Sequence, residues 1–313
     1  MTDRDTKLGR GAEFDLIRAM RDRWGDLATG IGDDAAVLQP GRGEKLVLST
    51  DATVEGVHFR RDWLSWREIG YRAITAALSD LAAMAAAPAG VLVSLELADA
   101  ERSIALEIAD GIGDAVRSAG ALILGGNVTR APHVAITTTV VGSAFAPLAR
   151  SGGRPGDLLY VTGALGGPAA ALRAWTAGGQ PAATARARFA RPVARLREAR
   201  WLAARGAVAA IDVSDGLAAD VGHLAAASDL AVEVHVELVP RVREASEEDA
   251  VAGGEEYELV VLSRAPLPER EFAERFGIPL TLIGKAIGNG ANVVLARDGK
   301  RVAAPPGYDH LSR

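Results

Sequence analysis

Acidic residues gather in four short motifs that also carry hydroxyl groups or glycine: GIGDD at residues 30–34, STD at 49–51, SD at 79–80 and DVSDG at 212–216. Aspartate and serine often occupy turns and helix caps, so each motif taken alone also fits a structural role. Asp80 fits that role poorly, because it falls inside an apolar helical pattern where an unpaired buried carboxylate is costly. Clusters of oxygen ligands without His or Cys suit Mg²⁺, which bridges substrate phosphates. The four motifs together therefore favour a magnesium site.

Four further positions carry side chains that could bind a ligand: His58 in VEGVHF, Arg150 before a glycine-rich turn, the GGEEY segment at 253–257, and Tyr308 near the C-terminus. Each also has an ordinary alternative. A lone histidine is often structural, an arginine is usually solvated, and Gly-Gly before acids can be a plain turn. Residues near a chain end are commonly poorly ordered. Residue type alone leaves these alternatives open.

Composition excludes several classes of protein. The chain has 35 Lys and Arg against 40 Asp and Glu, a net charge of −5, which argues against nucleic-acid or anionic-membrane surfaces. Cysteine is absent, which excludes disulfide scaffolds, thiolate metal sites and cysteine nucleophiles. None of its four lysines stands in a P-loop, and no complete dinucleotide fingerprint occurs. A phosphate substrate must therefore be bound by other means.

Hydrophobic periodicity predicts an α+β fold with two domains. In the first half we expect strands at 46–50, 90–97 and 133–141, with 121–124 leading into Gly125-Gly126, and helices at 68–86 and 101–119 packed on one sheet face. The turn cluster at 151–156 marks a boundary, giving domains 1–148 and 149–313. In the second, α/β half we expect helices at 167–177, around 193–204 and up to about 228, and strands at 158–161, 208–211, 231–236, 257–262, 280–283 and 292–295. Asp51 and Asp212 should each close a short strand.

No targeting or membrane segment is evident in the sequence. The first residues, MTDRDTKLGRG, are charged and lack an apolar core. The most apolar stretch, 82–98, is interrupted by polar residues and is too short to span a bilayer. We therefore expect a soluble, cytoplasmic protein.

Short motifs follow one another along nearly the whole chain. They are GAEF at 11–14, GIGDDAAV at 30–37, STD at 49–51, VEGVHF at 54–59, LSDLAAM at 78–84, GG at 125–126, RSGGRPGD at 150–157, VTGALG at 161–166, IDVSDGL at 211–217, GGEEYEL at 253–259 and GYDH at 307–310. In these motifs and in their order, the sequence resembles the thiamine-monophosphate kinase family of the aminoimidazole ribonucleotide synthetase superfamily.

The resemblance implies transfer of a phosphoryl group from ATP to thiamine monophosphate, in a homodimer that pairs through its N-terminal domain. It implies Mg²⁺ ligands at Asp34, Ser49, Thr50, Asp51, Asp80, Asp212 and Asp215. It implies ATP contacts at Gly126, Arg150 and Ser214, and thiamine contacts at His58, Glu255 and Tyr308. The aspartates at 51, 80, 212 and 215 would form the catalytic core. No general base is needed, because the accepting phosphate is mostly dianionic at neutral pH.

One position departs from the family pattern. The usual Gly-Gly-Asp is Gly125-Gly126-Asn127 here, so Asn127 would offer a neutral oxygen to Mg²⁺ and contact the nucleotide. A non-catalytic nucleotide-binding or sensor protein of the same fold is the alternative that this change keeps open. Superfamily members that depend on reactive cysteine or selenocysteine are disfavoured, because this chain has no cysteine.

The first-half strands also predict an assembly. They are apolar along much of their length, and such strands need cover on both faces. The two predicted helices cover one face, so we expect a second copy of the chain to cover the other.

Overall fold

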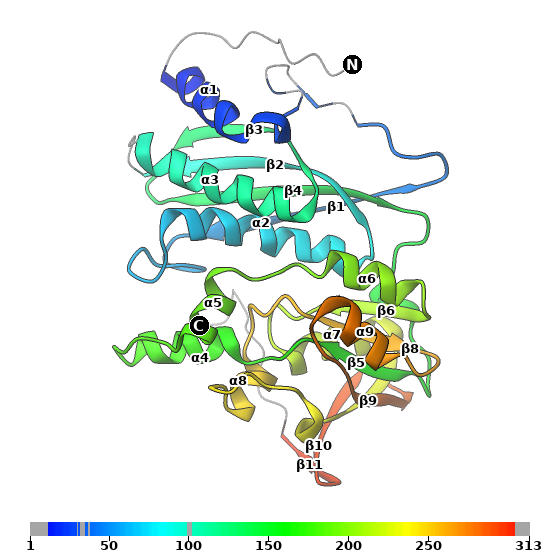
Figure 1. The fold of residues 1–313 in the computed structure, drawn as a ribbon. Coiled ribbons are helices and arrows are strands. Elements are labelled where there is room, and N and C mark those ends of the chain that lie inside the picture. Colours follow the sequence, from blue (N-terminus) through cyan, green and yellow to red (C-terminus); the bar gives the residue numbers. More distant parts are fainter. Residues whose placement is uncertain (1–11, 30, 32–34, 37, 99–101, 304–313) are drawn as a thin grey trace. The chain divides into compact units, whose positions relative to one another are not determined.

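The computed structural model describes residues 12–29, 31, 35–36, 38–98 and 102–303, which form two compact units. The first unit comprises residues up to 81 together with 86–146, and the second comprises 82–85 together with 147 onward. Each contains its own sheet (Figure 1). The fold class predicted from the sequence, α+β with an N-terminal sandwich followed by an α/β unit, is confirmed.

The first unit follows the expected order of strands and helices. Its elements are α1 (Ala12–Trp24), η1 (Gly25–Leu27), β1 (Lys45–Val54), α2 (Trp66–Ala83), β2 (Ala87–Leu97), α3 (Arg102–Ala119), β3 (Leu122–Arg130) and β4 (Ala135–Ala144). The sheet order is β1-β4-β2-β3, with β2 and β3 parallel and the other pairs antiparallel. Figure 1 shows α2 and α3 side by side across one face of this sheet.

Glycines allow the two helices to pack backbone against backbone. A Cβ on Gly70 of α2 would lie 2.2 Å from the Ile108 carbonyl oxygen, and one on Gly111 of α3 would lie 1.9 Å from that of Arg67. On the other side of α3, the Trp24 indole of α1 donates a hydrogen bond to the Ala109 carbonyl (2.8 Å). The close approach fixes the position of α2, which carries Asp80, against α3.

Several boundaries differ from the sequence prediction, including those of β1, β2 and β3. Strand β1 continues through Asp51 to Val54 instead of ending before it, because all ten of its residues pair with β4. Gly126 and Asn127 lie inside strand β3, where pairing with β2 overrides the turn preference of Gly-Gly. Pro88 lies within β2, at a register shift next to Gly90, which is where a strand tolerates a proline.

The second unit is built on a seven-stranded mixed sheet of order β11-β10-β7-β9-β5-β8-β6. Its strands are β5 (Leu158–Thr162), β6 (Ala207–Asp212), β7 (Leu230–His235), β8 (Leu259–Ser263), β9 (Leu280–Asn289), β10 (Asn292–Arg297) and β11 (Lys300–Val302). Its helices are η2 (Arg150–Gly152), α4 (Gly167–Thr176), α5 (Ala183–Ala190), α6 (Leu196–Ala203), α7 (Leu217–Ser228), η3 (Val236–Leu238), α8 (Glu247–Ala252) and α9 (Glu269–Phe276). Strand β8 is buried at every residue, so both faces of the sheet are covered there.

The core of this unit joins the strands to α7. Leu217, Val221 and Leu224 of the helix pack in one buried cluster with Ile211 of β6 and Leu262 of β8. The DVSDG motif consists of the last residue of β6 and the short connection to α7. Packing of both flanking elements into the core therefore holds that motif at the end of a buried strand.

Candidate functional site

The first group of candidate residues lies between β1 and α2. The Ser49 hydroxyl donates a hydrogen bond to Oδ2 of Asp80 at 2.5 Å, joining the strand to the helix. Asp51 lies two residues further along β1 and therefore on the same face as Ser49. All three side chains are half-buried. The structure thus brings Ser49, Asp51 and Asp80 to one side of the sheet, and the helical position of Asp80 predicted from sequence is correct.

Thr50 lies on the opposite face of β1. Its hydroxyl oxygen accepts a hydrogen bond from the hydroxyl of Thr139 on β4 (3.2 Å). Its side chain is thus separated by the sheet from those of Ser49 and Asp51.

The Gly126-Asn127 pair lies at the other edge of the same sheet. A Cβ on Gly126 would be 1.9 Å from the Val93 carbonyl oxygen, so only glycine fits beside β2. Asn127 is exposed and pairs with Ser94, on the sheet face opposite to that of Asp51. Strands β4 and β2 separate it from β1, a distance of about 14 Å at the usual strand spacing. Within one chain, Asn127 is therefore not brought next to Asp80.

His58 lies in a tight loop that follows β1. Its Nδ1 accepts a hydrogen bond from the Val54 amide (3.1 Å), so in the neutral ring the proton is on Nε2. Within the same loop, Glu55 forms an ion pair with Arg61 and accepts from the Val134 amide (3.2 Å). The hydrogen bond from Arg61 lowers the pKa of Glu55 below its usual range. The loop is therefore held in a fixed shape, with His58 able to donate from Nε2.

The DVSDG motif forms the second group of candidates. Asp212 is the last residue of β6, as predicted, and is buried. One oxygen of Asp220, in the first turn of α7, accepts hydrogen bonds from the amides of Ser214, Asp215 and Gly216 at 3.0, 3.0 and 3.1 Å. Burial, together with repulsion from Asp212, raises the pKa of Asp220 to about 7. Sequence reasoning missed Asp220, because its role depends on the direction of three backbone N–H groups.

Asp220 also belongs to a group of three potential ligands. Asp215, Asp220 and His223 each offer one ligand atom, and these atoms lie within 4.8 Å of one another. Asp220 and His223 are three residues apart on one helix, a spacing that the sequence does show.

The GGEEY segment lies directly against this loop. The amide of Glu255 donates to the Ser214 carbonyl (2.8 Å), and those of Glu256 and Tyr257 donate to the Val213 carbonyl (3.1 and 2.9 Å). A Cβ on Gly254 would lie 2.2 Å from the Ser214 carbonyl oxygen, so this approach requires glycine. The Glu255 side chain is half-buried and accepts a hydrogen bond from the Tyr257 hydroxyl (2.6 Å).

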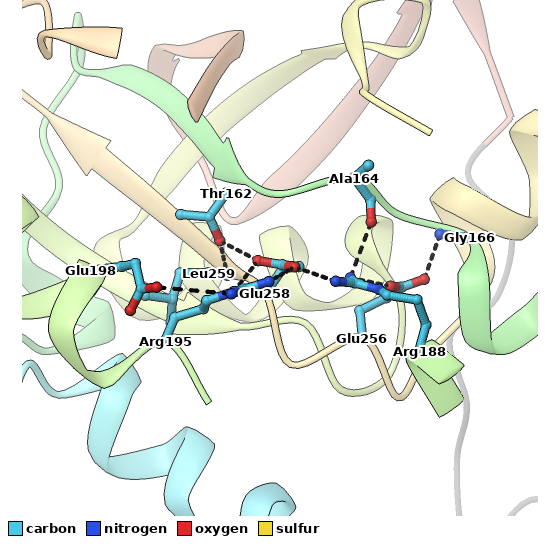
Figure 2. A network of polar contacts seen from close by, with 9 residues as sticks. All are labelled: Thr162, Ala164, Gly166, Arg188, Arg195, Glu198, Glu256, Glu258 and Leu259. Atoms are coloured by element: carbon cyan, nitrogen blue, oxygen red, sulfur yellow. Dashed lines mark hydrogen bonds and ion pairs between the residues drawn. The ribbon is translucent and has the colours of Figure 1, made fainter. Parts of the chain in front are cut away.

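A buried network of charges anchors Glu256 of this segment and the next-but-one residue, Glu258 (Figure 2). Glu258 binds Arg188 (2.8 Å), both Nε and Nη2 of Arg195 (2.7 and 2.5 Å) and the Thr162 hydroxyl (2.7 Å). Glu256 binds Arg188 (3.1 Å) and the Gly166 amide. Burial raises the pKa of Glu256 to about 7 although Arg188 opposes the shift. For Glu258 burial acts in the same direction, but the two guanidinium groups outweigh it and lower its pKa.

Arg150 is held through its backbone. Its carbonyl accepts a hydrogen bond from the Ser228 hydroxyl (2.6 Å), and the same hydroxyl accepts from the Gly153 amide (3.2 Å). Its side chain is exposed in η2. The predicted ligands Asp34 and Tyr308 lie outside the described residues.

The donor set fits the metal that the sequence predicts. Carboxylates and hydroxyl groups supply the oxygen ligands in both groups, and Mg²⁺ prefers oxygen ligands. None of the described helices is long and apolar enough to cross a membrane.

Comparison with known proteins defines the class of this fold and site. Residues 32–144 match the family model for the N-terminal domain of AIR synthase related proteins, and residues 154–296 match the model for their C-terminal domain. A thiamine-monophosphate kinase of Escherichia coli (strain K12) is 35% identical over 96% of both chains, and that of Rhodopirellula baltica is 34% identical over 84% of both.

Solved structures agree with these matches. The crystal structure of thiamine-monophosphate kinase from Stenotrophomonas maltophilia K279a has a TM-score of 0.81 at 34% identity, covering 94% of this chain and 98% of that one. AaThiL complexed with AMPPCP and TMP has a TM-score of 0.76 at 30% identity, covering 96% and 97%. The chain belongs to the AIR synthase related proteins and, among them, to the thiamine-monophosphate kinase family.

Proposed function

We propose that this chain transfers the γ-phosphoryl group of ATP to thiamine monophosphate, giving ADP and thiamine diphosphate. The observation that carries the proposal is similarity along nearly the whole chain to thiamine-monophosphate kinases, one of which is complexed with AMPPCP and TMP. The attacking oxygen belongs to a phosphate that is already ionised, so the reaction needs charge neutralisation and in-line positioning more than a base.

In this proposal each of the two acidic groups holds Mg²⁺. Asp51 and Asp80, with Ser49, would supply ligands from the first unit, and Asp212 and Asp215 would supply them from the second. Bound Mg²⁺ would neutralise charge on the transferring phosphoryl group. The remaining proposed ligands are Asp34, Thr50 and Asn127.

The other proposed contacts divide between nucleotide and thiamine. Gly126, Asn127, Arg150 and Ser214 would contact ATP, and His58, Glu255 and Tyr308 would contact thiamine monophosphate. His58 can donate a hydrogen bond from Nε2 because its Nδ1 is already an acceptor. Asp220 holds the amides of residues 214–216 and so fixes the loop that carries Ser214 and Asp215.

We also propose a homodimer that pairs through the sheet of the domain formed by residues 1–148, with residues 149–313 as the second domain. On the face of β1 that points away from α2, Leu46 and Leu48 remain 48% and 61% exposed. Apolar side chains on a sheet face without a covering layer favour burial against a second copy. Because ATP is supplied there, we place the reaction in the cytoplasm.

An ADP-release assay coupled to thiamine monophosphate tests the function. We expect turnover that requires thiamine monophosphate, ATP and Mg²⁺ together. Nucleotide binding without turnover at any thiamine monophosphate concentration would overturn the proposal and would leave a nucleotide-binding protein.

A further inference from the structure

We infer that Tyr257 is a positioning residue for the thiamine site, because its hydroxyl fixes the carboxylate of Glu255. The inference rests on the proposed function, in which Glu255 contacts thiamine monophosphate. It assigns to Tyr257 a part in selecting the acceptor substrate.

The first observation is the backbone of the segment. Glu255 and Tyr257 have φ of +66° and +55°, a left-handed conformation that glycine and asparagine adopt more readily than either of these residues. Strain of this kind persists only where the surrounding structure enforces it, and it concentrates at binding and catalytic sites. A turn that served only to connect two elements would be more stable with Gly or Asn at both positions. The side chains at 255 and 257 therefore have a function beyond forming a turn.

The second observation is what enforces this backbone. The amides of residues 255–257 all donate to the carbonyls of Val213 and Ser214, in the loop that carries the proposed metal ligands. Glu256 and Glu258, which alternate with the strained residues, are anchored by Arg188 and Arg195 in the buried network of Figure 2. The side chains of Glu255 and Tyr257 contact each other instead.

The third observation is the contact between the two side chains. The Tyr257 hydroxyl donates to Oε2 of Glu255 at 2.6 Å, the short distance typical of a hydrogen bond to an ionised carboxylate. Tyr257 is 8% exposed, so its ring cannot move freely. A rigid donor on one oxygen fixes the orientation of the whole carboxylate and keeps its charge at one place.

A fixed negative charge suits thiamine monophosphate better than ATP. The thiazolium ring of thiamine is permanently positive, whereas no part of ATP is positive at neutral pH. Removing the hydroxyl of Tyr257 should therefore weaken binding of the acceptor and leave binding of the nucleotide unchanged.

The test measures KM for both substrates in Tyr257→Phe, which keeps the ring and removes only the hydroxyl. We expect KM for thiamine monophosphate to rise about tenfold, the effect of one charge-assisted hydrogen bond, with KM for ATP within twofold of wild type. Tyr160→Phe is the matched control. Tyr160 is also buried in the second unit, and its hydroxyl accepts a hydrogen bond from the Leu267 amide (3.2 Å) far along the chain from Glu255. A merely structural role would move both variants alike.

A double-mutant cycle with Glu255→Gln provides the second measurement. If Tyr257 acts through Glu255, adding Tyr257→Phe to Glu255→Gln should raise KM for thiamine monophosphate less than twofold further. If the wild type is active and Tyr257→Phe leaves KM for thiamine monophosphate unchanged, this inference alone is overturned. Full additivity in the double-mutant cycle overturns it as well. A wild type without turnover on thiamine monophosphate overturns the proposed function itself.

Discussion

Replacing Thr138 by valine should stabilise the protein, which is unusual for a change in a core. Thr138 lies in the middle of β4, opposite Asp51 on one side and Val93 on the other, and it is 0% exposed. Its hydroxyl has no hydrogen-bond partner among the residues that the structure describes. A buried hydroxyl without a partner costs about 1–3 kcal/mol, and valine has nearly the same shape. We expect the free energy of unfolding to rise by about 2 kcal/mol.

Thr162→Val is the matched control, because Thr162 is also a strand residue with 0% exposure. Its hydroxyl donates to Glu258 (2.7 Å) and accepts from the Leu259 amide (2.9 Å). The same substitution should cost about 3–5 kcal/mol here, because the Leu259 amide loses its acceptor and the buried Glu258 carboxylate loses one of its hydrogen bonds. One chemical change is thus expected to act with opposite signs at two equally buried sites.

Thermal unfolding of the chain in EDTA measures both variants. A gain of about 2 kcal/mol should raise the melting temperature by roughly 4–8 °C for a unit of this size. A lower melting temperature for Thr138→Val would refute the reasoning, since it would mean that the hydroxyl is hydrogen-bonded in solution. A buried water molecule beside Asp51 would then be the simplest partner.

Four further predictions follow from the site and the sheet. The raised pKa of Asp220 means that the folded chain binds a proton more tightly than the unfolded chain. The free energy of unfolding should therefore fall by about 4 kcal/mol as pH rises from 3.8 to about 7. Asp220→Asn should flatten this pH dependence in EDTA, and an unchanged slope would contradict the prediction. Asp80→Asn should lower turnover by orders of magnitude while raising the melting temperature, because it relieves carboxylate repulsion; wild-type turnover would rule out Asp80 as a metal ligand. Asn127→Asp should lower the Mg²⁺ concentration that gives half-maximal rate, and a requirement that stays the same or rises would argue that Asn127 is no ligand. Sedimentation should give about twice 32.5 kDa even at high dilution, through an interface on the order of 2,000 Å² or more, and an active monomer would disprove the dimer.

The sequence predicted those parts of the site that depend on hydrophobic pattern. Asp80 falls in α2 and Asp212 closes β6, because apolar runs on either side define a helix and a buried strand. The end of β1 was misjudged, because its later residues, TDAT at 50–53, lack an apolar run, and only pairing with β4 shows that they form a strand. Gly125 and Gly126 likewise carry no strand pattern, and only pairing with β2 shows that they lie in β3.

Other features of the site could not be predicted from residue type. Asp220 is recognisable only from three N–H groups that converge on one of its oxygens. Tyr257 is recognisable only from a positive φ and a contact two residues away. Backbone direction decides both roles, and it results from packing of the whole unit.

The buried charges behind the GGEEY segment restrict how this chain can diverge. Arg188, Arg195, Glu256 and Glu258 form a buried set of ion pairs, in which Glu258 binds both arginines. Losing one member would leave an uncompensated buried charge, at about 3–5 kcal/mol, against a total stability of roughly 5–15 kcal/mol for a typical protein. Single replacements would therefore be eliminated before a compensating second change could arise. In a set of related sequences, these four positions are expected to vary jointly or remain fixed, although none of them is proposed to touch a substrate.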